Sequence, residues 1–389
     1  MMPYRQARLC CLITTLLLAG CTAKPALKSE GGVVAPPQSV LLQTAVAPVP
    51  TVTDIFALTA EQQREFLAYF NAPSRQAVAK HRRIYHFLSE HLTGFTYLGE
   101  NYSAAQSYAS KSGNCISLAV LTKALADLVG VEIEFQTIVS APVYSIDGDF
   151  MLSSDHVRTI LYDPDFVAPN DAVYFSKPAI IVDYLPAATD VTGPRVSENT
   201  FIAMFYRNLA ADAVLQANYT QALALLRTAL DYAPTYAAVI NLIAIVHRRV
   251  EQQTIAEQFY QYGLQVADVK TTLISNYAVL KHNMGETEQA EALLQSLKSH
   301  DEHDPYRWYI LGKEAAFKQQ YDDAIVFYRK AITQAPYLHQ LHFELAVAYY
   351  NNHQPARARQ SLATAAELSL ITNQQQRYHA KLQAIARRQ

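Results

Sequence analysis

The chain has 389 residues, which is too long for one hydrophobic core of ordinary size, so two or three domains are expected. Half of the residues are hydrophobic and only 17% are charged, so most of the chain can bury a core. The formal net charge of −2 provides no basic field, which argues against a nucleic-acid partner.

Residues 1–20 have the pattern of a secretion signal. Arg5 and Arg8 precede an apolar stretch, Leu9 to Leu18, that is too short to span a bilayer as a mature helix. The stretch ends in Leu18-Ala19-Gly20-Cys21, which resembles the lipobox of bacterial lipoproteins. The resemblance implies cleavage before Cys21, acyl chains on Cys21 and a membrane anchor. Thr22, in place of an aspartate, implies the outer membrane, facing the periplasm. An ordinary cleaved signal with a chance cysteine is the alternative.

Residues 21–55 are rich in Ala, Pro, Val, Gly and Ser and show neither a helical nor a strand period, so a flexible tether is expected. Cleavage of the signal removes Cys10 and Cys11. Apart from the lipidated Cys21, Cys115 is then the one cysteine of the mature chain. A thiol without a disulfide partner in an oxidising compartment is a candidate reactive group.

Residues 56–198 predict an α+β domain. Helices are expected over 61–70, from a Ser74 cap to 92, and over 116–128, where Gly130 ends the helix. Strands are expected over 131–139, 156–162 and 179–184, with a loop between the last two. Helices followed by antiparallel strands are typical of an α+β layout.

Residues 199–372 are helical and repeat every 34 residues. Alanine recurs at one phase of the frame, at Ala222, Ala256, Ala290, Ala324 and Ala358. The unit 305–338 carries Trp308, Gly312, Tyr328 and Pro336 and resembles the tetratricopeptide (TPR) signature. Five TPR repeats in an all-α solenoid are therefore expected, closed by a capping helix over 373–389. An irregular helical bundle is the alternative.

Cys115 follows Asn114, a good N-cap, and so lies in the first turn of a helix, where the helix dipole favours a thiolate. The N–H groups of the same turn can hold an oxyanion. Such a nucleophile needs a base, for which His156 is the candidate, and an orienting group, for which Asp183 is the candidate. Asp163 and Asp165 are rivals for the third role.

Gly113-Asn114-Cys115, Asp155-His156-Val157 and Ile181-Val182-Asp183 together resemble the transglutaminase-like fold, which is related to papain. The resemblance implies that Cys115 is the nucleophile, His156 the general base and acid, and Asp183 its orienter. By the same analogy Gln106 is a candidate oxyanion donor, beside the backbone N–H of Cys115. The implied activities are amide hydrolysis and acyl transfer, and no motif predicts a metal or cofactor.

In TPR proteins particular positions of the first helix of each repeat line the concave face. The residues expected there are Tyr306, Tyr309, Phe343, Val347 and Tyr350, with charge from Arg207, Arg248 and Lys313. Aromatic and cationic side chains suit a peptide or protein partner, although ordinary exposed or packing residues give the same pattern. Two functions follow: a thiol enzyme that recruits its substrate through the solenoid, and a catalytically silent adaptor.

Overall fold

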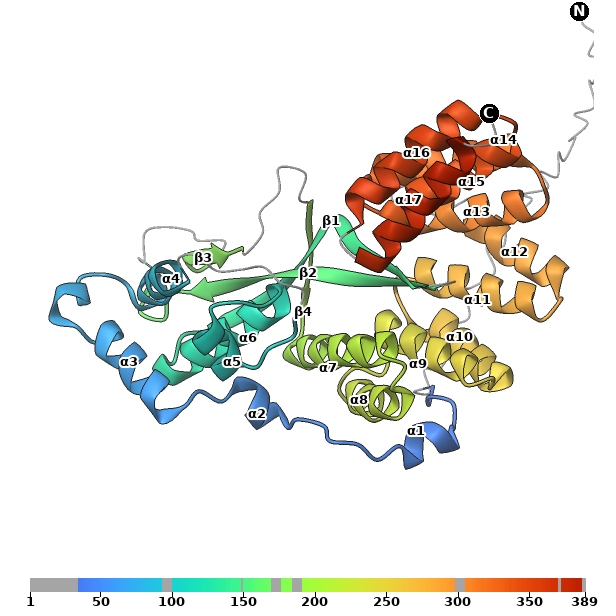
Figure 1. Cartoon of the computed structure of the whole chain (residues 1–389). Helices are drawn as coiled ribbons and strands as arrows, with labels where there is room; N and C mark the ends of the chain where they lie inside the picture. Colours follow the sequence, from blue (N-terminus) through green and yellow to red (C-terminus); the bar gives the residue numbers. More distant parts are fainter. Residues whose placement is uncertain are drawn as a thin grey trace, which may run out of the picture. The chain divides into compact units, whose positions relative to one another are not determined.

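The computed structural model describes residues 34–92, 100–147, 150–168, 176–183, 191–297, 305–369 and 372–386 (Figure 1). Inside β1 and β2 it does not describe the side chains of residues 139–155. The chain divides into Met1–Ala35 and Pro36–Gln389, and only the second unit is described below. The predicted signal and Cys21 lie outside the described residues. Among those that are described, no helix combines the length and apolar character needed to cross a bilayer.

Residues 36–56 form a docked N-terminal segment with two short helices, α1 (Val40–Thr44) and α2 (Val52–Phe56). Leu42 and Ile55 are buried, and the carbonyl oxygen of Pro50 accepts a hydrogen bond of 2.7 Å from the Tyr206 hydroxyl. The prediction of a flexible tether over 21–55 is therefore wrong for residues 36–55. The apolar side chains of this segment show no helical or strand period because they pack against helices far along the chain.

Five helical elements come next: α3 (Ala60–Phe70), the 3-10 turn η1 (Pro73–Arg75), α4 (Lys80–His91), α5 (Ala104–Ser110) and α6 (Cys115–Val129). The helix expected from Ser74 begins only at Lys80. Arg83 explains the difference, because its guanidinium donates to the carbonyl oxygens of Phe70, Gln76 and Val78 and so stabilises a connection that is not α-helical. In α6 the side chains of residues 115–126 are all buried, and Gly130 ends the helix with a φ of 66°.

The sheet is antiparallel, with the order β3 (Ala179–Val182), β2 (Phe150–Tyr162), β1 (Ile133–Asp147) and β4 (Val191–Val196). Sequence patterns missed β4 because Gly193 and Pro194 interrupt it. Proline lacks an N–H and is tolerated at a sheet edge, which β4 is. At Gly193 a Cβ would lie 2.8 Å from the carbonyl oxygen of Thr137, so the close approach of β1 and β4 requires glycine.

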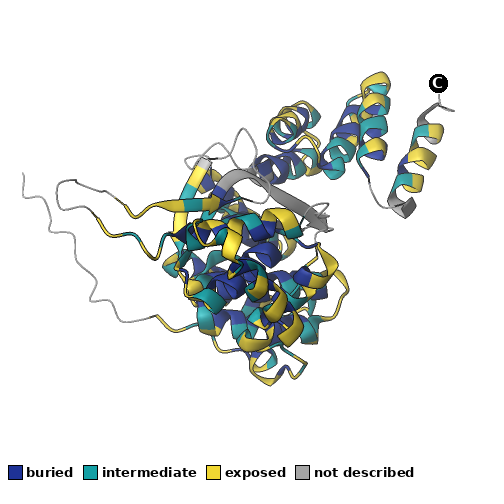
Figure 2. Ribbon diagram, turned by 90° about the vertical axis from the view of Figure 1, so that its left-hand side faces the viewer, coloured by how far each residue is buried: buried dark blue, intermediate teal, exposed yellow. Residues whose placement is uncertain are grey.

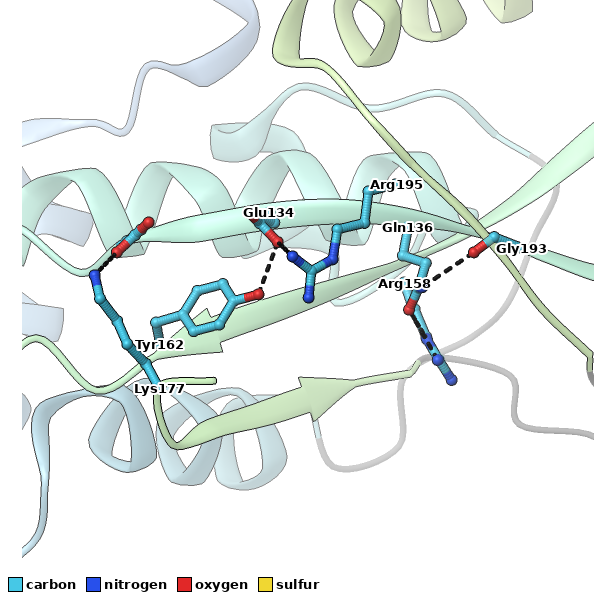
Figure 3. Close-up of polar contacts among 8 residues, drawn as sticks. Glu134, Gln136, Arg158, Tyr162, Lys177, Gly193 and Arg195 are labelled. Carbon is cyan, nitrogen blue, oxygen red and sulfur yellow. Dashed lines mark hydrogen bonds and ion pairs between the residues drawn. The ribbon is translucent and has the colours of Figure 1, made fainter. Parts of the chain in front are cut away.

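The two faces of the sheet differ. On one face Phe135, Val157 and Leu161 are buried, and the Phe135 ring stacks on Phe201 of the next helix with centroids 3.8 Å apart. The opposite face is polar, and Figure 3 shows its contacts: the Tyr162 hydroxyl donates to Glu134 at 2.7 Å, and Arg195 pairs with the same carboxylate at 2.8 Å. The face that meets α6 and α7 is thus apolar, whereas on the other face Ile138, Ile160 and Tyr162 are buried beside charged side chains.

The rest of the described chain consists of helices. They are α7 (Glu198–Leu215), α8 (Tyr219–Tyr232), α9 (Ala237–Arg249), α10 (Gln253–Val266), α11 (Thr271–Asn283), α12 (Thr287–Leu297), α13 (Pro305–Phe317), α14 (Tyr321–Gln334), α15 (His339–Asn351), α16 (Pro355–Leu368) and α17 (Thr372–Ala386). The five phase-locked alanines are each at most 3% exposed. At Gly312 a Cβ would lie 2.5 Å from the Tyr328 ring, so the second helix of a pair approaches the first as closely as glycine allows.

The backbone repeats with the same period. Left-handed residues connect the helices of each pair at Ala217, Glu251, Gly285, Gln319 and His353, with φ between 56° and 80° and a constant spacing of 34 residues. Only one of the five is glycine, so the turn recurs because the packing demands it and not because glycine favours it. The predicted helical repeat is confirmed, and this part of the chain is an all-α solenoid of helix pairs.

Two large buried clusters run through the described residues. One joins the α+β part to α7–α11, from Leu42 through Leu121 and Phe201 to Leu280. The other joins α11–α16, from Ile274 to Ala358. Figure 2 shows buried residues on the inner sides of the helices and exposed residues on the outer sides. The first two helix pairs therefore share a core with the α+β part, whereas the later pairs have their own.

Candidate active site

Cys115 is the first residue of α6 and is 8% exposed. Asn114 caps the helix in extended conformation, and its side-chain oxygen accepts from the Ser117 N–H at 2.9 Å. The helix itself supplies no acceptor for the N–H groups of its first turn, and its dipole stabilises negative charge there. The predicted helix start at the Asn114 cap agrees with the structure.

Gly113 is required at the residue before the cap. Its φ is +142°, a conformation that L side chains rarely adopt, and a Cβ would lie 2.7 Å from the Cβ of Ser117. The Gly113-Asn114-Cys115 sequence is thus a local structural unit: a glycine turn, a cap and a thiol at a helix start.

His156 lies between Cys115 and Asp183. Its Nε2 is 3.2 Å from Oδ1 of Asp183, and its ring also hydrogen-bonds the Cys115 sulfur. Because Asp183 engages Nε2, Nδ1 is the nitrogen available to the sulfur. The hydrogen bond and charge of Cys115, together with Asp183, outweigh burial and raise the pKa of His156 to about 9. The structure therefore brings all three predicted residues together and favours an imidazolium beside the sulfur.

Both partners of the cysteine occupy places where strand alternation ends. His156 pairs with Ile138, the last residue of β1 before a register shift that separates Ile138 from Val143. Asp183 follows Val182, the last residue of β3. A bulge re-aims neighbouring side chains, and a residue beyond a strand is released from alternation. These two irregularities explain how the side chains of His156 and Asp183 reach Cys115, which the regular alternation of side chains along a strand does not predict.

The rival carboxylates have other partners. Asp163 lies 3.7 Å from Nδ1 of His81, and Asp165 pairs with Lys80 at 2.9 Å. Gln106 is exposed, and its side-chain oxygen accepts from the Ser103 N–H at 2.9 Å in a capping box at the start of α5. The geometry thus favours Asp183 as orienter and assigns Gln106 to helix capping, so the oxyanion role expected of Gln106 has no support here.

The arrangement places a sulfur, an imidazole and a carboxylate in one line of contacts. Among the described residues there is no group of three or more His, Cys, Asp or Glu side chains that could hold a metal ion. A sulfur in a buried first turn, an imidazole that is both donor and base, and a carboxylate behind the ring are the components of nucleophilic acyl transfer.

The residues expected on the concave face of the solenoid have mixed outcomes. Arg207 is 5% exposed and Tyr309 is 2% exposed, so neither lies on an open surface, although Tyr309 lines an apolar cavity between α11, α12 and α13. Arg248 is half-buried, and Phe343 is half-buried with its ring stacked on Tyr378 of α17 at 5.2 Å. The prediction of an exposed recognition surface is wrong for Arg207 and Tyr309. For Arg207 the reason is that α7 contacts both the α+β part and α8, which positions within a repeat do not reveal.

Tyr350 and Val347 are exposed as predicted, at 39% and 37%, whereas the Tyr306 side chain lies outside the described residues. Lys313 pairs with Glu344 at 3.3 Å. Sequence reasoning missed an apolar cavity of about 160 Å³ between α11, α12 and α13, next to Phe317, which is 72% exposed. An aromatic residue at the end of a repeat helix was the available signal for it.

Comparison with known proteins finds similarity in solved structures only. PilF of Pseudomonas aeruginosa matches 49% of this chain and 87% of its own, with 17% identity and a TM-score of 0.40. YrrB, described as a TPR protein with an unusual peptide-binding site, matches 46% of this chain and 91% of its own, with 19% identity and a TM-score of 0.31. MamA of Desulfovibrio magneticus RS-1 matches 44% of this chain and 96% of its own, with 15% identity and a TM-score of 0.32.

No protein-family model and no curated protein matches the chain. The transglutaminase-like character of the α+β part therefore stays a prediction. The description of the solenoid rests on its own helices, turns and 34-residue period.

Proposed function

We propose that the α+β part is a thiol enzyme that cleaves or transfers amide-linked acyl groups, with Cys115 as nucleophile, His156 as proton carrier and Asp183 as its orienter. The observation that carries the proposal is the His156 ring, which hydrogen-bonds the Cys115 sulfur and lies 3.2 Å from Asp183. The resemblance of the Gly113-Asn114-Cys115 motif to transglutaminase-like proteins points to the same chemistry.

The reaction proceeds through a thioester. The Cys115 thiolate forms a bond to the carbonyl carbon of the substrate amide, and the carbonyl oxygen becomes an oxyanion facing the N–H groups of the first turn of α6. His156, as imidazolium, gives its proton to the leaving nitrogen while the C–N bond breaks. Water or an amine then attacks the thioester, His156 takes up the proton released, and the thiolate leaves.

Iodoacetamide tests the reactivity of the sulfur in the full chain. Site-resolved mass spectrometry measures the rate of Cys115 alkylation at neutral pH in the wild type and in His156→Ala. We expect wild-type Cys115 to react much faster than free cysteine and His156→Ala to slow it by roughly tenfold or more, because the thiolate is the nucleophile and loss of the neighbouring imidazolium lowers the thiolate fraction. Equal rates in the two proteins would contradict the proposal. Labelling of intact envelopes, with Cys115→Ser as control, then identifies the acylated peptide.

A second proposed function is binding of a protein or peptide partner by the solenoid, without chemistry at Cys115. The exposed Tyr350 and Val347 and the apolar cavity beside Phe317 favour it. Aromatic and apolar side chains that are exposed close together are typical of interaction surfaces. Cys115→Ala preserves the biological effect under this function and abolishes it under the first. In either case we propose that a lipid on Cys21 anchors the protein in the bacterial envelope.

A further inference from the structure

A chain of three polar side chains connects the solenoid to the residue before Cys115. Asp212 of α7 accepts a hydrogen bond of 2.8 Å from the Asn101 amide. The Asn101 oxygen in turn accepts from the Asn114 amide at 2.7 Å. Asn114 is the N-cap of α6. Asp212 and Asn101 are 111 residues apart in sequence, so the contact is made by the fold and not by local geometry.

The direction of each hydrogen bond in this chain is determined. The Asn114 oxygen is occupied by the Ser117 N–H at 2.9 Å, so its NH₂ group must face Asn101. Asn101 therefore presents its oxygen to Asn114 and its own NH₂ group to α7. Only an acceptor can meet that NH₂ group, and the Asp212 carboxylate is an acceptor when ionised. Removal of Asp212 leaves the Asn101 amide free to flip, and a flipped Asn101 would set its NH₂ group against the NH₂ group of Asn114.

Surrounding contacts hold the same segment. The Asn114 N–H donates to the carbonyl oxygen of Glu100 at 3.1 Å, and the Ser117 hydroxyl donates to the same carbonyl at 3.0 Å. The Tyr102 N–H donates to the Ser117 hydroxyl at 2.8 Å. The segment at Glu100–Tyr102 is thus fastened to the start of α6 on one side and to the solenoid through Asn101 on the other. A shift of Asn101 moves the turn that carries Cys115.

Asp212 lies in a half-buried position between two charges. Burial raises its pKa, the Asn101 hydrogen bond and the Arg207 charge lower it, and Glu100 raises it. Arg207, which sequence counting placed on the partner-binding face, is buried in α7 near this carboxylate. Burial has the largest effect, so the pKa of Asp212 lies above the ordinary value of an aspartate, while the Asn101 hydrogen bond and the Arg207 charge act in favour of the ionised, accepting form.

We infer that Asp212 is a positioning residue for the Cys115 site: through Asn101 and Asn114, a helix of the solenoid fixes the first turn of α6 and with it the sulfur and the oxyanion-binding N–H groups. The inference rests on the proposed thiol chemistry. Under this inference α7 positions the Cys115 site, in addition to being the first helix of the solenoid. Misplacement of reacting groups by about 1 Å costs on the order of 100-fold in rate, so a small shift at Asn101 is enough to be measured.

The test compares four full-length proteins by the rate of Cys115 alkylation with iodoacetamide from pH 5 to 9: wild type, Asp212→Ala, Asp212→Asn and Asp322→Ala. Asp322 is the matched control, because it accepts from the Asn352 amide at 2.7 Å in the later part of the solenoid. We expect Asp212→Ala to slow alkylation at neutral pH by roughly tenfold or more and to change the shape of the pH profile. Asp212→Asn keeps an acceptor oxygen and should stay within about threefold of the wild type, and Asp322→Ala should not differ from it.

Asn101→Ala provides a second variant that breaks the chain of hydrogen bonds outside the solenoid, should Asp212→Ala fail to fold. Asn101→Ala should slow the alkylation of Cys115 as Asp212→Ala does, while its helices unfold as they do in the wild type. A wild type that reacts fast, together with Asp212→Ala and Asn101→Ala that react equally fast, overturns the positioning role and leaves the proposed function intact. A wild type that reacts no faster than free cysteine overturns the proposed function itself.

Discussion

The early and late helix pairs of the solenoid have the same backbone and different surroundings. Helices α7–α11 share a buried cluster with the α+β part, and Phe201 of α7 stacks on Phe135 of β1. Helices α13–α16 form a separate cluster, around Tyr328 and Leu341, that contains no residue of the α+β part. The comparison teaches that a uniform repeat can have two kinds of surroundings: the early pairs bury their apolar side chains together with the α+β part, and the late pairs bury theirs among themselves.

The largest expected effect separates the two clusters directly. Phe201→Ala and Leu341→Ala each remove a fully buried side chain and should destabilise the protein by about 3–5 and 2–5 kcal/mol, respectively. Hydrogen exchange, read helix by helix, should show lost protection in α6 and α7 for the first variant and in α14–α16 for the second. Equal loss of protection in α6 for both variants would mean that the two clusters unfold as one.

A smaller effect concerns pH, and it should be confined to the early region. The contacts of His156 with Cys115 and Asp183 raise its pKa from 6.5 to about 9. Because the pKa is raised on folding, the stabilisation is fully present below pH 6.5 and is lost as the pH rises through about 9. The free energy of unfolding of the wild type, measured with denaturant, should therefore fall between these pH values. The free energy of unfolding of His156→Gln should not show this fall. A slope that persists in the variant would place its origin elsewhere.

Histidines whose pKa is lowered by burial should respond to pH in the opposite sense: His339 in the late region, and His81 and His247 in the early region. Burial lowers the pKa of His339, which lies in α15 beside Tyr378. A lowered histidine pKa means that stability is lost as the pH falls below 6.5. Protection of α15 measured by hydrogen exchange should decrease on acidification in the wild type and not in His339→Gln, whereas α6 should be unaffected by that substitution.

The smallest expected effects come from surface ion pairs, one in each region. Arg75 pairs with Glu90 at 3.1 Å, and Lys318 pairs with Glu314 at 2.9 Å. Arg75→Ala and Lys318→Ala should each cost about 0.2–1 kcal/mol, and the cost should shrink in high salt. A larger cost for either variant would indicate that surface charge, and not the buried clusters, distinguishes the two regions.

Local signals were enough to predict much of this molecule. The cap at Asn114, the stop at Gly130 and the alanine phase of the solenoid each depend on residues close together in sequence. The three site residues followed from the chemistry a helix-start thiol requires, and the structure brings them together. What the pattern could not provide was the register shift next to His156, which depends on strand pairing.

The failures share one physical cause. Three features were missed because they depend on partners distant in sequence: the docked N-terminal segment, β4 and the burial of Arg207. Short polar or Pro-containing segments show no hydrophobic period from which such contacts could be predicted. Arg207 occupies a repeat position that predicts an exposed side chain, and it is buried in α7. Local propensity is a weak guide wherever tertiary contacts decide burial.

The docked N-terminal segment has a consequence for biosynthesis. In a buried hydrogen bond of 2.6 Å, the Ser39 hydroxyl donates to Nε2 of His247, whose Nδ1–H bonds the Ile243 carbonyl. These partners are 208 residues apart. At roughly 5–20 residues per second, His247 leaves the ribosome about 10–40 s after Ser39. The segment therefore cannot complete its docking until α9 has been made, and a nascent chain that stops before α9 lacks this hydrogen bond while it keeps the contacts of Pro50 with Tyr206 and of Gln43 with Arg227.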